Sequence, residues 1–390
     1  MLTRSLRTSI LALLLSSATI SAGRAAEDDP EYNGRRLSQW DQMLREEQNA
    51  RLRRVALISM GQIASDNSLN SKLVKQVMTA VGRALKTDST PSVRKQAAEV
   101  VNTMAVKLLE DGKNSDTTSV IIDLSENLRV EKESDVRKVV AVALGRFGKE
   151  SKPGVTALIT ILADKEPGTR AAAADTLGRI GSGASGAVDA LIPLLKETEI
   201  SVRAAAIFAL GRIEPDEPAK VSAALLPLVT GEPELELRRA VLASLGILAD
   251  RSPATVQGTA VGLLDADVDV RRQAAIALSK FTGGGKIVEK ELKKAFEEDK
   301  DKQVRGFALR ALCAGFGADV KVLLPTIVAR LKIEPEFDVR IAIIEELGAL
   351  GSEGQEALPA LREAQKDPQT KVRESATGAI KRIANPKPKM

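Results

Sequence analysis

The stretch Ser201-Val-Arg-Ala-Ala-Ala-Ile-Phe-Ala-Leu-Gly-Arg-Ile213 recurs along the chain with small changes. Each copy has an arginine at the start of a helix-forming run, and the copies most like the quoted one end that run in Leu-Gly. The ten arginines in this register are Arg53, Arg94, Arg137, Arg170, Arg203, Arg238, Arg271, Arg305, Arg340 and Arg373. Neighbouring arginines are 33 to 43 residues apart. A period of this size predicts a solenoid, in which each unit buries its apolar surface against its neighbours.

An acidic residue stands six positions before every one of these arginines. The acids are Glu47, Asp88, Glu131, Asp164, Glu197, Glu232, Asp265, Asp299, Glu334 and Asp367. Acidic residues occupy only 52 of 390 positions, so ten matches in ten are not chance. Because every repeat carries the pair, whereas an active site occurs once, we predict a structural ladder. In this ladder, each arginine hydrogen-bonds to carboxylates and carbonyl groups within and between repeats and so orients the turns.

Each repeat is predicted to be two helices joined by a short turn. In the quoted copy, residues 187–196 have apolar side chains at helical spacing, 197–201 form the turn, and 202–213 form the second helix. Gly211 removes side-chain bulk where the next repeat must fit. No strand pattern is found, so the sequence predicts an all-α solenoid of about ten helix pairs over residues 37–384.

The N-terminal residues 1–26 are typical of a cleaved signal peptide. Arg4 and Arg7 precede a short apolar run, and small residues follow it. The run is shorter than the roughly 20 residues that a membrane-spanning helix needs. We therefore expect export, most simply to a bacterial periplasm, and no transmembrane segment after cleavage. The alternative is an uncleaved anchor.

The two ends of the mature chain are predicted to differ from the repeats. A polar lead, 27–36, is followed by a helix over about 39–47 that Ser38 caps. Tyr32 and Trp40, the only Tyr and Trp, are expected to cover the open edge of the first repeat, although an aromatic handle for a ligand is the alternative. Residues 385–390 contain two prolines and are expected to form a mobile basic tail.

The composition excludes several classes of protein. The chain has no histidine and one cysteine, which excludes most zinc, copper, haem and iron sites and leaves an all-carboxylate ion site as the alternative. We expect no cofactor, no metal and no catalytic residue. Cys313 occupies a position usually filled by glycine and has no histidine to act as its base, so we expect a packed residue. The net charge of +5 is small and acids are interspersed, which argues against specific nucleic-acid binding.

The repeated helix pair, the Val-Arg…Ala…Leu-Gly string and the acid six residues before arginine resemble HEAT repeats. The 33-residue copies resemble the HEAT-like class named after phycobilisome bilin lyases, here in a secreted bacterial member. The resemblance covers about residues 37–383. It implies a right-handed, armadillo-like α-α superhelix whose second helices line the concave side, but it indicates little about function because solenoids host unrelated activities.

On such a concave side, the solvent-facing positions are the third, fourth, seventh and eleventh residues counted from Val202 or its equivalent. They supply the candidate partner-binding residues Arg146, Arg179, Arg212, Phe208, Ile276, Lys280 and Phe307. Arginine beside apolar side chains suits an acidic or partly apolar protein or peptide. The simpler interpretation is that basic residues near helix C-termini complement the helix dipole.

We therefore expect a non-enzymatic extracytoplasmic scaffold for an unidentified protein or peptide. A binder of polyanions, such as an acidic envelope polymer, is the alternative, and a steep salt dependence of its affinity would reveal it. The resemblance also leaves open a bilin-lyase-like enzyme or chaperone, but no catalytic motif of that kind is present. Iron hydroxylases of similar architecture are excluded because they depend on His-Glu metal motifs.

Overall fold

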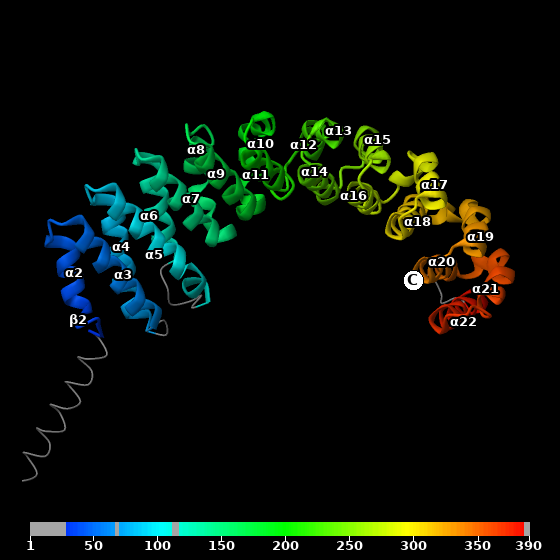
Figure 1. The fold of residues 1–390 in the computed structure, drawn as a ribbon, viewed down its shortest axis with the longest axis horizontal. Helices are drawn as coiled ribbons and strands as arrows, with labels where there is room; N and C mark the ends of the chain where they lie inside the picture. The colour runs from blue at the N-terminus through cyan, green and yellow to red at the C-terminus, as the bar shows by residue number, and fades with distance from the viewer. Residues whose placement is uncertain (1–28, 67–69, 111–116, 386–390) are drawn as a thin grey trace, which may run out of the picture. The chain divides into compact units, whose positions relative to one another are not determined.

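The computed structural model describes residues 29–66, 70–110 and 117–385. The predicted signal peptide and residues 386–390 of the predicted tail lie outside the described residues. The chain divides into two compact units, Met1–Ala187 and Val188–Met390. Each unit is a stack of helix pairs (Figure 1), so the predicted all-α solenoid is confirmed.

The first unit holds the N-terminal repeats. In chain order its elements are β1 (Glu31–Tyr32), β2 (Arg35–Arg36), α2 (Leu37–Glu46), α3 (Ala50–Asp66), α4 (Ser71–Thr87), α5 (Pro91–Glu110), α6 (Thr117–Val130), α7 (Ser134–Arg146), the 3₁₀ helix η1 (Gly148–Gly154), α8 (Val155–Ile161), α9 (Pro167–Ile180) and the 3₁₀ helix η2 (Gly181–Ala187). The second helices of its repeats are α3, α5, α7 and α9, and each packs beside the next.

The second unit continues the same pattern. Its elements are α10 (Val188–Leu191), η3 (Ile192–Lys196), α11 (Ile200–Leu210), α12 (Pro218–Leu225), α13 (Leu228–Gly231), α14 (Leu235–Leu248), α15 (Pro253–Val261), η4 (Gly262–Leu264), α16 (Val268–Leu278), η5 (Gly284–Lys286), α17 (Glu289–Glu298), α18 (Lys302–Phe316), η6 (Gly317–Leu323), α19 (Leu324–Ile333), α20 (Phe337–Ala349), η7 (Gly351–Ala357), α21 (Leu358–Ala364) and α22 (Thr370–Ala384). Its second helices, α11, α14, α16, α18, α20 and α22, form one row, and the first helices form the other (Figure 1).

The core runs between the two rows of helices. Val202, Ala206 and Leu210 lie on one face of α11 and are fully buried. Small residues let the next second helix approach closely. A Cβ atom on Gly211 would lie 2.4 Å from Oγ of Ser244, which belongs to the following repeat. The expected role of this glycine in repeat packing therefore has a direct steric basis.

The expectation of no strand is wrong at the N-terminus. Residues Glu31–Tyr32 and Arg35–Arg36 pair as a two-stranded antiparallel hairpin. Asn33 and Gly34 both have positive φ angles, which the turn of a tight hairpin requires. The Asn-Gly dipeptide was the available sequence signal for this hairpin.

The predicted cap of the first helix is also wrong. Helix α2 begins at Leu37, so Ser38 lies inside it, and the Oγ of Ser38 donates a hydrogen bond to Oδ2 of Asp29 at 2.8 Å. Trp40 is buried, and its indole N–H donates to the carbonyl of Tyr32 at 3.0 Å. The hairpin and Trp40 thus pack on the first repeat, and the indole is not available as an exposed handle.

Some first helices are less regular than the sequence predicts. The helix expected over 187–196 is a short α10 followed by the 3₁₀ helix η3, which contains Pro193. Proline lacks the N–H that a continuing α-helix would use, so the helical hydrogen-bond pattern changes there. The second helix of the same repeat ends at Leu210 rather than at Ile213.

Candidate functional site

The register arginines bind the turn of their own repeat. In all ten repeats, Nη1 of the arginine donates a hydrogen bond to the backbone carbonyl of the acid six residues earlier, at 2.7–3.0 Å. This contact satisfies a carbonyl at the end of the first helix. The six-residue spacing in the sequence therefore reflects a bond to the backbone of the acid, and the side chain of that acid points elsewhere.

The acid side chains bind the arginine of the preceding repeat. The pairs are Arg53–Asp88, Arg94–Glu131 and Arg137–Asp164 in the first unit, and Arg203–Glu232, Arg238–Asp265, Arg271–Asp299, Arg305–Glu334 and Arg340–Asp367 in the second. The Nε–carboxylate distances are 2.5–3.0 Å. Each guanidinium thus joins two repeats, and we refer to these pairs as the ladder.

The ladder carboxylates also fix the turns that follow them. The amide of Glu234 donates to Glu232 at 3.1 Å, and the amide of Glu336 donates to Glu334 at 3.0 Å. The hydrogen bonds from Arg203 lower the pKa of Glu232 below its ordinary value despite burial. Burial would raise the pKa of Glu334, but hydrogen bonds from Arg305, the Glu336 amide and Arg330 lower it. These groups are committed to internal contacts and are poorly placed to bind a partner.

The second helices of the second unit expose a mixed apolar and basic surface. Phe208 on α11 is half-buried, and the guanidinium of Arg212 lies 4.6 Å from the centre of its ring. Ile247 on α14 is 52% exposed. Ile276 on α16 is half-buried, and Lys280 just beyond that helix is exposed.

The same surface continues on α18. Phe307 is half-buried there, and the guanidinium of Arg310 lies 5.6 Å from the centre of its ring. Consecutive second helices pack side by side, from α11 through α14 and α16 to α18. Equivalent positions on packed helices are separated by about 8–10 Å, so the residues form one band. We refer to Phe208, Arg212, Ile247, Ile276, Lys280, Phe307 and Arg310 as the second-helix face.

Two members of this face were absent from the candidates that the sequence supplied. Ile247 occupies the eleventh position of its repeat, and Arg310 occupies the seventh. The same counting rule reaches both residues. The eleventh position is arginine or lysine in several repeats, and this pattern favours charge over an isoleucine in the same row.

The remaining candidates lie in the first unit. Nε of Arg146 donates to Oδ1 of Asn102 at 3.0 Å, and Nε of Arg179 pairs with Asp175 at 2.6 Å. Arg212 belongs to the second unit, so the three arginines that the sequence groups together divide between the two units. Because Arg179 already has a carboxylate partner, its charge is partly neutralised, whereas Arg212 lies over a ring and pairs with no carboxylate among the described residues.

Glycine near the end of the second helix makes room for basic side chains of the next repeat. A Cβ atom on Gly246 would lie 3.6 Å from Cδ of Lys280, and one on Gly348 would lie 2.6 Å from Nη2 of Arg382. Lys280 therefore lies across the preceding helix with its aliphatic part beside Gly246, whereas Arg382 brings its guanidinium to Gly348. The Lys280 side chain thus reaches α14 at Gly246, the residue before Ile247.

Cys313 has the properties of a packed residue. Burial, and then the charge of Glu346, raise the pKa of its thiol far above the ordinary value, so the thiolate is disfavoured. Burial also raises the pKa of Glu346, which occupies a position filled by Ala, Ser, Thr or Val in the other repeats. A thiol held in this state is a poor nucleophile.

Neither a metal cluster nor a membrane-spanning helix occurs among the described residues. In that part of the chain, no group of three or more Cys, Asp or Glu residues is arranged to hold a metal ion. No helix within the same residues is long and apolar enough to cross a membrane.

Comparison with protein families gives one match. The HEAT repeats model matches residues 121–210, 188–279 and 289–381, which is more than half of the chain. The chain belongs to the HEAT-repeat family. In such a solenoid each helix pair contacts only its neighbours, and the ladder joins neighbouring pairs in the same way. Comparison with curated proteins gives no match.

Solved structures share the solenoid fold at low sequence identity. A crystal structure of an engineered protein matches with a TM-score of 0.60 and 18% identity, over 90% of this chain and 99% of that one. Yeast importin-beta (Kap95p) matches with a TM-score of 0.54 and 15% identity, over 89% of this chain and 51% of that one. A further importin-beta structure matches with a TM-score of 0.57 and 15% identity, over 96% of this chain and 54% of that one. The HEAT-repeat chain thus spans about half the length of the importin chains, and the likeness shows the fold alone.

Proposed function

We propose that this HEAT-repeat chain is a non-enzymatic scaffold that binds a protein or peptide partner on the second-helix face of its second unit. One observation carries the proposal: four successive second helices expose apolar side chains beside three cations. Among the described residues, Arg212, Lys280 and Arg310 form no ion pair. Aromatic, isoleucine and arginine side chains together are typical of the residues that dominate binding energy at protein interfaces.

The chemistry of this face suggests the kind of partner. Apolar side chains favour a segment with its own apolar residues, because each buried Å² of apolar surface contributes about 25 cal/mol. The unpaired cations favour carboxylates near those residues. The partner that fits best is therefore an acidic segment with interspersed apolar side chains.

The comparisons support a binding role without identifying the partner. HEAT-repeat solenoids are commonly protein-interaction scaffolds. One of the matching structures shows Kap95p binding to RanGDP, with a TM-score of 0.54 to this chain and 12% identity, over 91% of this chain and 53% of that one. That is a property of Kap95p, and we extend to this chain only the general mode of binding a protein on a solenoid.

We further propose that the protein acts outside the cytoplasm as a secreted bacterial member of the HEAT-like class named after bilin lyases. The signal-peptide pattern of residues 1–26 and the 33-residue repeats support this proposal. N-terminal sequencing of the mature protein, expressed in a bacterium with its leader, tests it. Cleavage within residues 21–26 is expected, and retention of Met1 on cytoplasmic protein would contradict export.

The binding proposal is tested by affinity capture from the envelope fraction of the native organism. The bait variant Arg212→Glu/Lys280→Glu/Arg310→Glu reverses three charges on the second-helix face. The matched control, Lys321→Glu/Lys332→Glu/Lys366→Glu, makes the same change in net charge at exposed lysines of the first helices and their turns.

The proposal requires one protein that wild type and the control retain and the face variant loses. If all three baits retain that protein equally, the face assignment is wrong. If no protein is retained but polyanion-coated beads bind the wild type with a steep salt dependence, the envelope-polymer alternative replaces the protein scaffold.

A further inference from the structure

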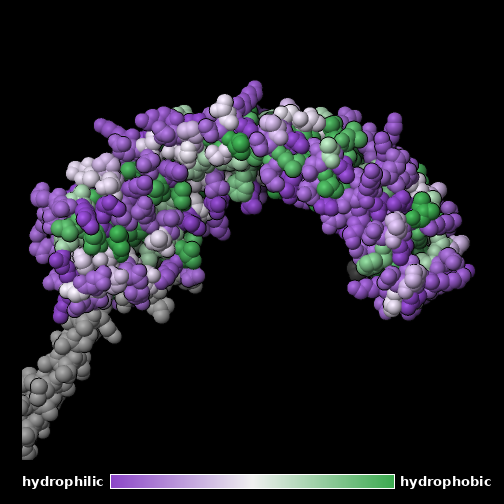
Figure 2. All heavy atoms as spheres, viewed as in Figure 1, coloured by the Kyte–Doolittle hydropathy of each residue, from purple (hydrophilic) through white to green (hydrophobic). Residues whose placement is uncertain are grey.

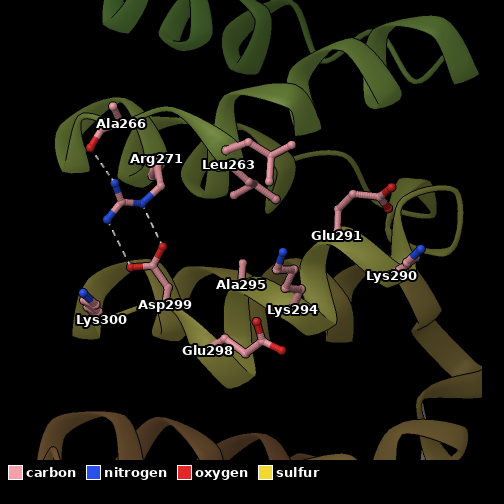
Figure 3. A pocket seen from close by; sticks show the side chains of 11 residues that line it. Leu263, Ala266, Arg271, Lys290, Glu291, Lys294, Ala295, Glu298, Asp299 and Lys300 are labelled. Carbon is pink, nitrogen blue, oxygen red and sulfur yellow. Dashed lines mark hydrogen bonds and ion pairs between the residues drawn. The ribbon is translucent and has the colours of Figure 1, made fainter.

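A hollow of about 530 Å³ lies on the other side of the second unit, among the first helices. Figure 3 shows it between two walls. Leu263 and Leu264 of η4 form one wall, and Lys290, Lys294 and Ala295 of α17 form the other. Its volume falls within the range of about 300–1,000 Å³ that is typical of ligand sites.

The wall of Leu263 and Leu264 belongs to a segment that is unusually free of charge. Helices α15 and η4, residues 253–264, contain no ionisable side chain, although 28% of the whole chain is Asp, Glu, Lys or Arg. Val261 is 44% exposed and Leu264 is 67% exposed. Figure 2 shows hydrophobic side chains gathered in this region. Covering such an apolar surface with a partner lowers the free energy, so the surface favours binding.

The opposite wall carries three lysines, without partners in the described part of the chain, beside two glutamates. Lys290 and Lys294 are four residues apart and therefore lie on the same side of α17, and Lys300 follows in the turn. None of these three ammonium groups has an ion-pair or hydrogen-bond partner among the described residues. By contrast, Lys293 on the same helix pairs with Glu289 at 2.6 Å.

The ladder closes one end of the hollow with a rigid, neutral wall. Arg271 donates to the carbonyl of Ala266 and to the carboxylate of Asp299 (Figure 3). It also donates to the carbonyl of Asp265. The opposite charges of Arg271 and Asp299 cancel, and the hydrogen bonds hold both side chains in place. Glu291 and Glu298 also line the hollow, so the three unpaired lysines leave a net charge of one positive unit.

We propose that this hollow is a second docking site, which takes an acidic peptide segment of a partner protein that also carries leucine or phenylalanine. The carboxylates of the segment lie against Lys290, Lys294 and Lys300, and its apolar side chains cover Leu264, since Leu263 is already buried. A plain polyanion uses only the small net charge and leaves the apolar wall exposed. Because the ladder and the helix pair already fix both walls, little of the site must be ordered on binding.

The test uses the full chain and a defined probe. The probe is a fluorescein-labelled peptide of alternating glutamate and leucine, and its binding is measured by fluorescence anisotropy. One comparison peptide has serine in place of leucine, and another has glutamine in place of glutamate. The proposal predicts that both comparison peptides bind at least about tenfold more weakly than the probe.

Variants of the chain then locate the binding. Lys290→Glu/Lys294→Glu and, separately, Leu264→Ser are each expected to weaken probe binding about tenfold or more. The matched controls are Lys293→Glu/Lys366→Glu for the charge change and Val322→Ser, which is 67% exposed, for the loss of an apolar side chain. Circular dichroism checks that each variant is folded.

Three outcomes would overturn the proposal: no saturable binding to the wild type, equal loss in the matched controls, or equal affinity for the serine peptide, which would show attraction by charge alone. The triple variant of the second-helix face is expected to leave probe binding unchanged. Loss of probe binding in that variant would place the peptide on the other face. The two sites can therefore fail independently.

Discussion

Arg305→Ala is predicted to destabilise the second unit by about 3 kcal/mol, at the lower end of the range of 3–5 kcal/mol for breaking a buried ion pair. Arg305 is 3% exposed and Glu334 is 4% exposed. The guanidinium donates to both carboxylate oxygens of Glu334 and to the carbonyls of Asp299 and Lys300. The lower end applies because Arg330 still donates to Glu334 at 2.9 Å after the substitution.

Urea unfolding followed by far-ultraviolet circular dichroism measures this loss, and hydrogen exchange locates it. Stability in a solenoid is a sum of nearest-neighbour terms, so amides of α18, α19 and α20 should lose protection first. The control is Lys302→Ala on the same helix. Its pair with Asp338 has side chains that are 44% and 53% exposed, and solvent screens such exposed pairs so that they contribute little to stability. Equal, small losses for the two variants would refute the ladder as a source of stability.

Three further predictions concern packing and pH. Gly315→Ala is expected to destabilise the protein, because the added Cβ would lie 2.2 Å from the backbone of an adjacent turn. Gly306→Ala on the same helix adds a Cβ that meets nothing within 4 Å, so it should stabilise the protein by about 0.5–1 kcal/mol. Urea midpoints compare the two variants. Asp301 has its pKa lowered to about 2 by hydrogen bonds from Arg272, so its contribution to stability is present above the unfolded value near 3.8 and is lost as the pH falls toward 2. Asp301→Asn should flatten the stability profile in that window, and an unchanged acid profile would contradict this. Glu346 has its pKa raised by burial, so the stability it contributes is complete below its unfolded pKa and is lost as the pH rises through the folded value. Glu346→Gln should therefore raise the melting temperature at neutral pH, with the gain disappearing below about pH 4; a gain that does not depend on pH would argue against titration of this carboxyl.

Most of the fold could be predicted from the repeat pattern, because every repeat packs its helices in the same way. Positions such as Val202, Ala206 and Leu210 face the core in copy after copy, so period alone locates both helices. The spacing of acid and arginine indicated which residues take part in the ladder. It did not reveal that the arginine bonds the backbone of its own acid and the side chain of the next one, since that depends on how repeats stack.

Local exceptions were harder to predict. The hairpin at Asn33 and Gly34 is two residues long on each side, too short for an alternating pattern to register. The second-helix face was only partly predicted, because counting positions gives exposure but not whether a charge is already paired. Arg179 pairs with Asp175, whereas Arg212 does not pair with a carboxylate, and this difference is visible only in three dimensions.

The most direct test of the binding scaffold is photo-crosslinking from defined positions. A benzophenone amino acid is placed at Ile247 on the second-helix face, which is 52% exposed, or at Val322 on the first-helix side, which is 67% exposed. Each protein is irradiated with the envelope fraction, and adducts are identified by mass spectrometry. The account predicts one dominant protein adduct from position 247 that is absent from position 322 and is lost when Arg212, Lys280 and Arg310 are changed to glutamate. The same adducts from both positions, or none from position 247, would contradict it.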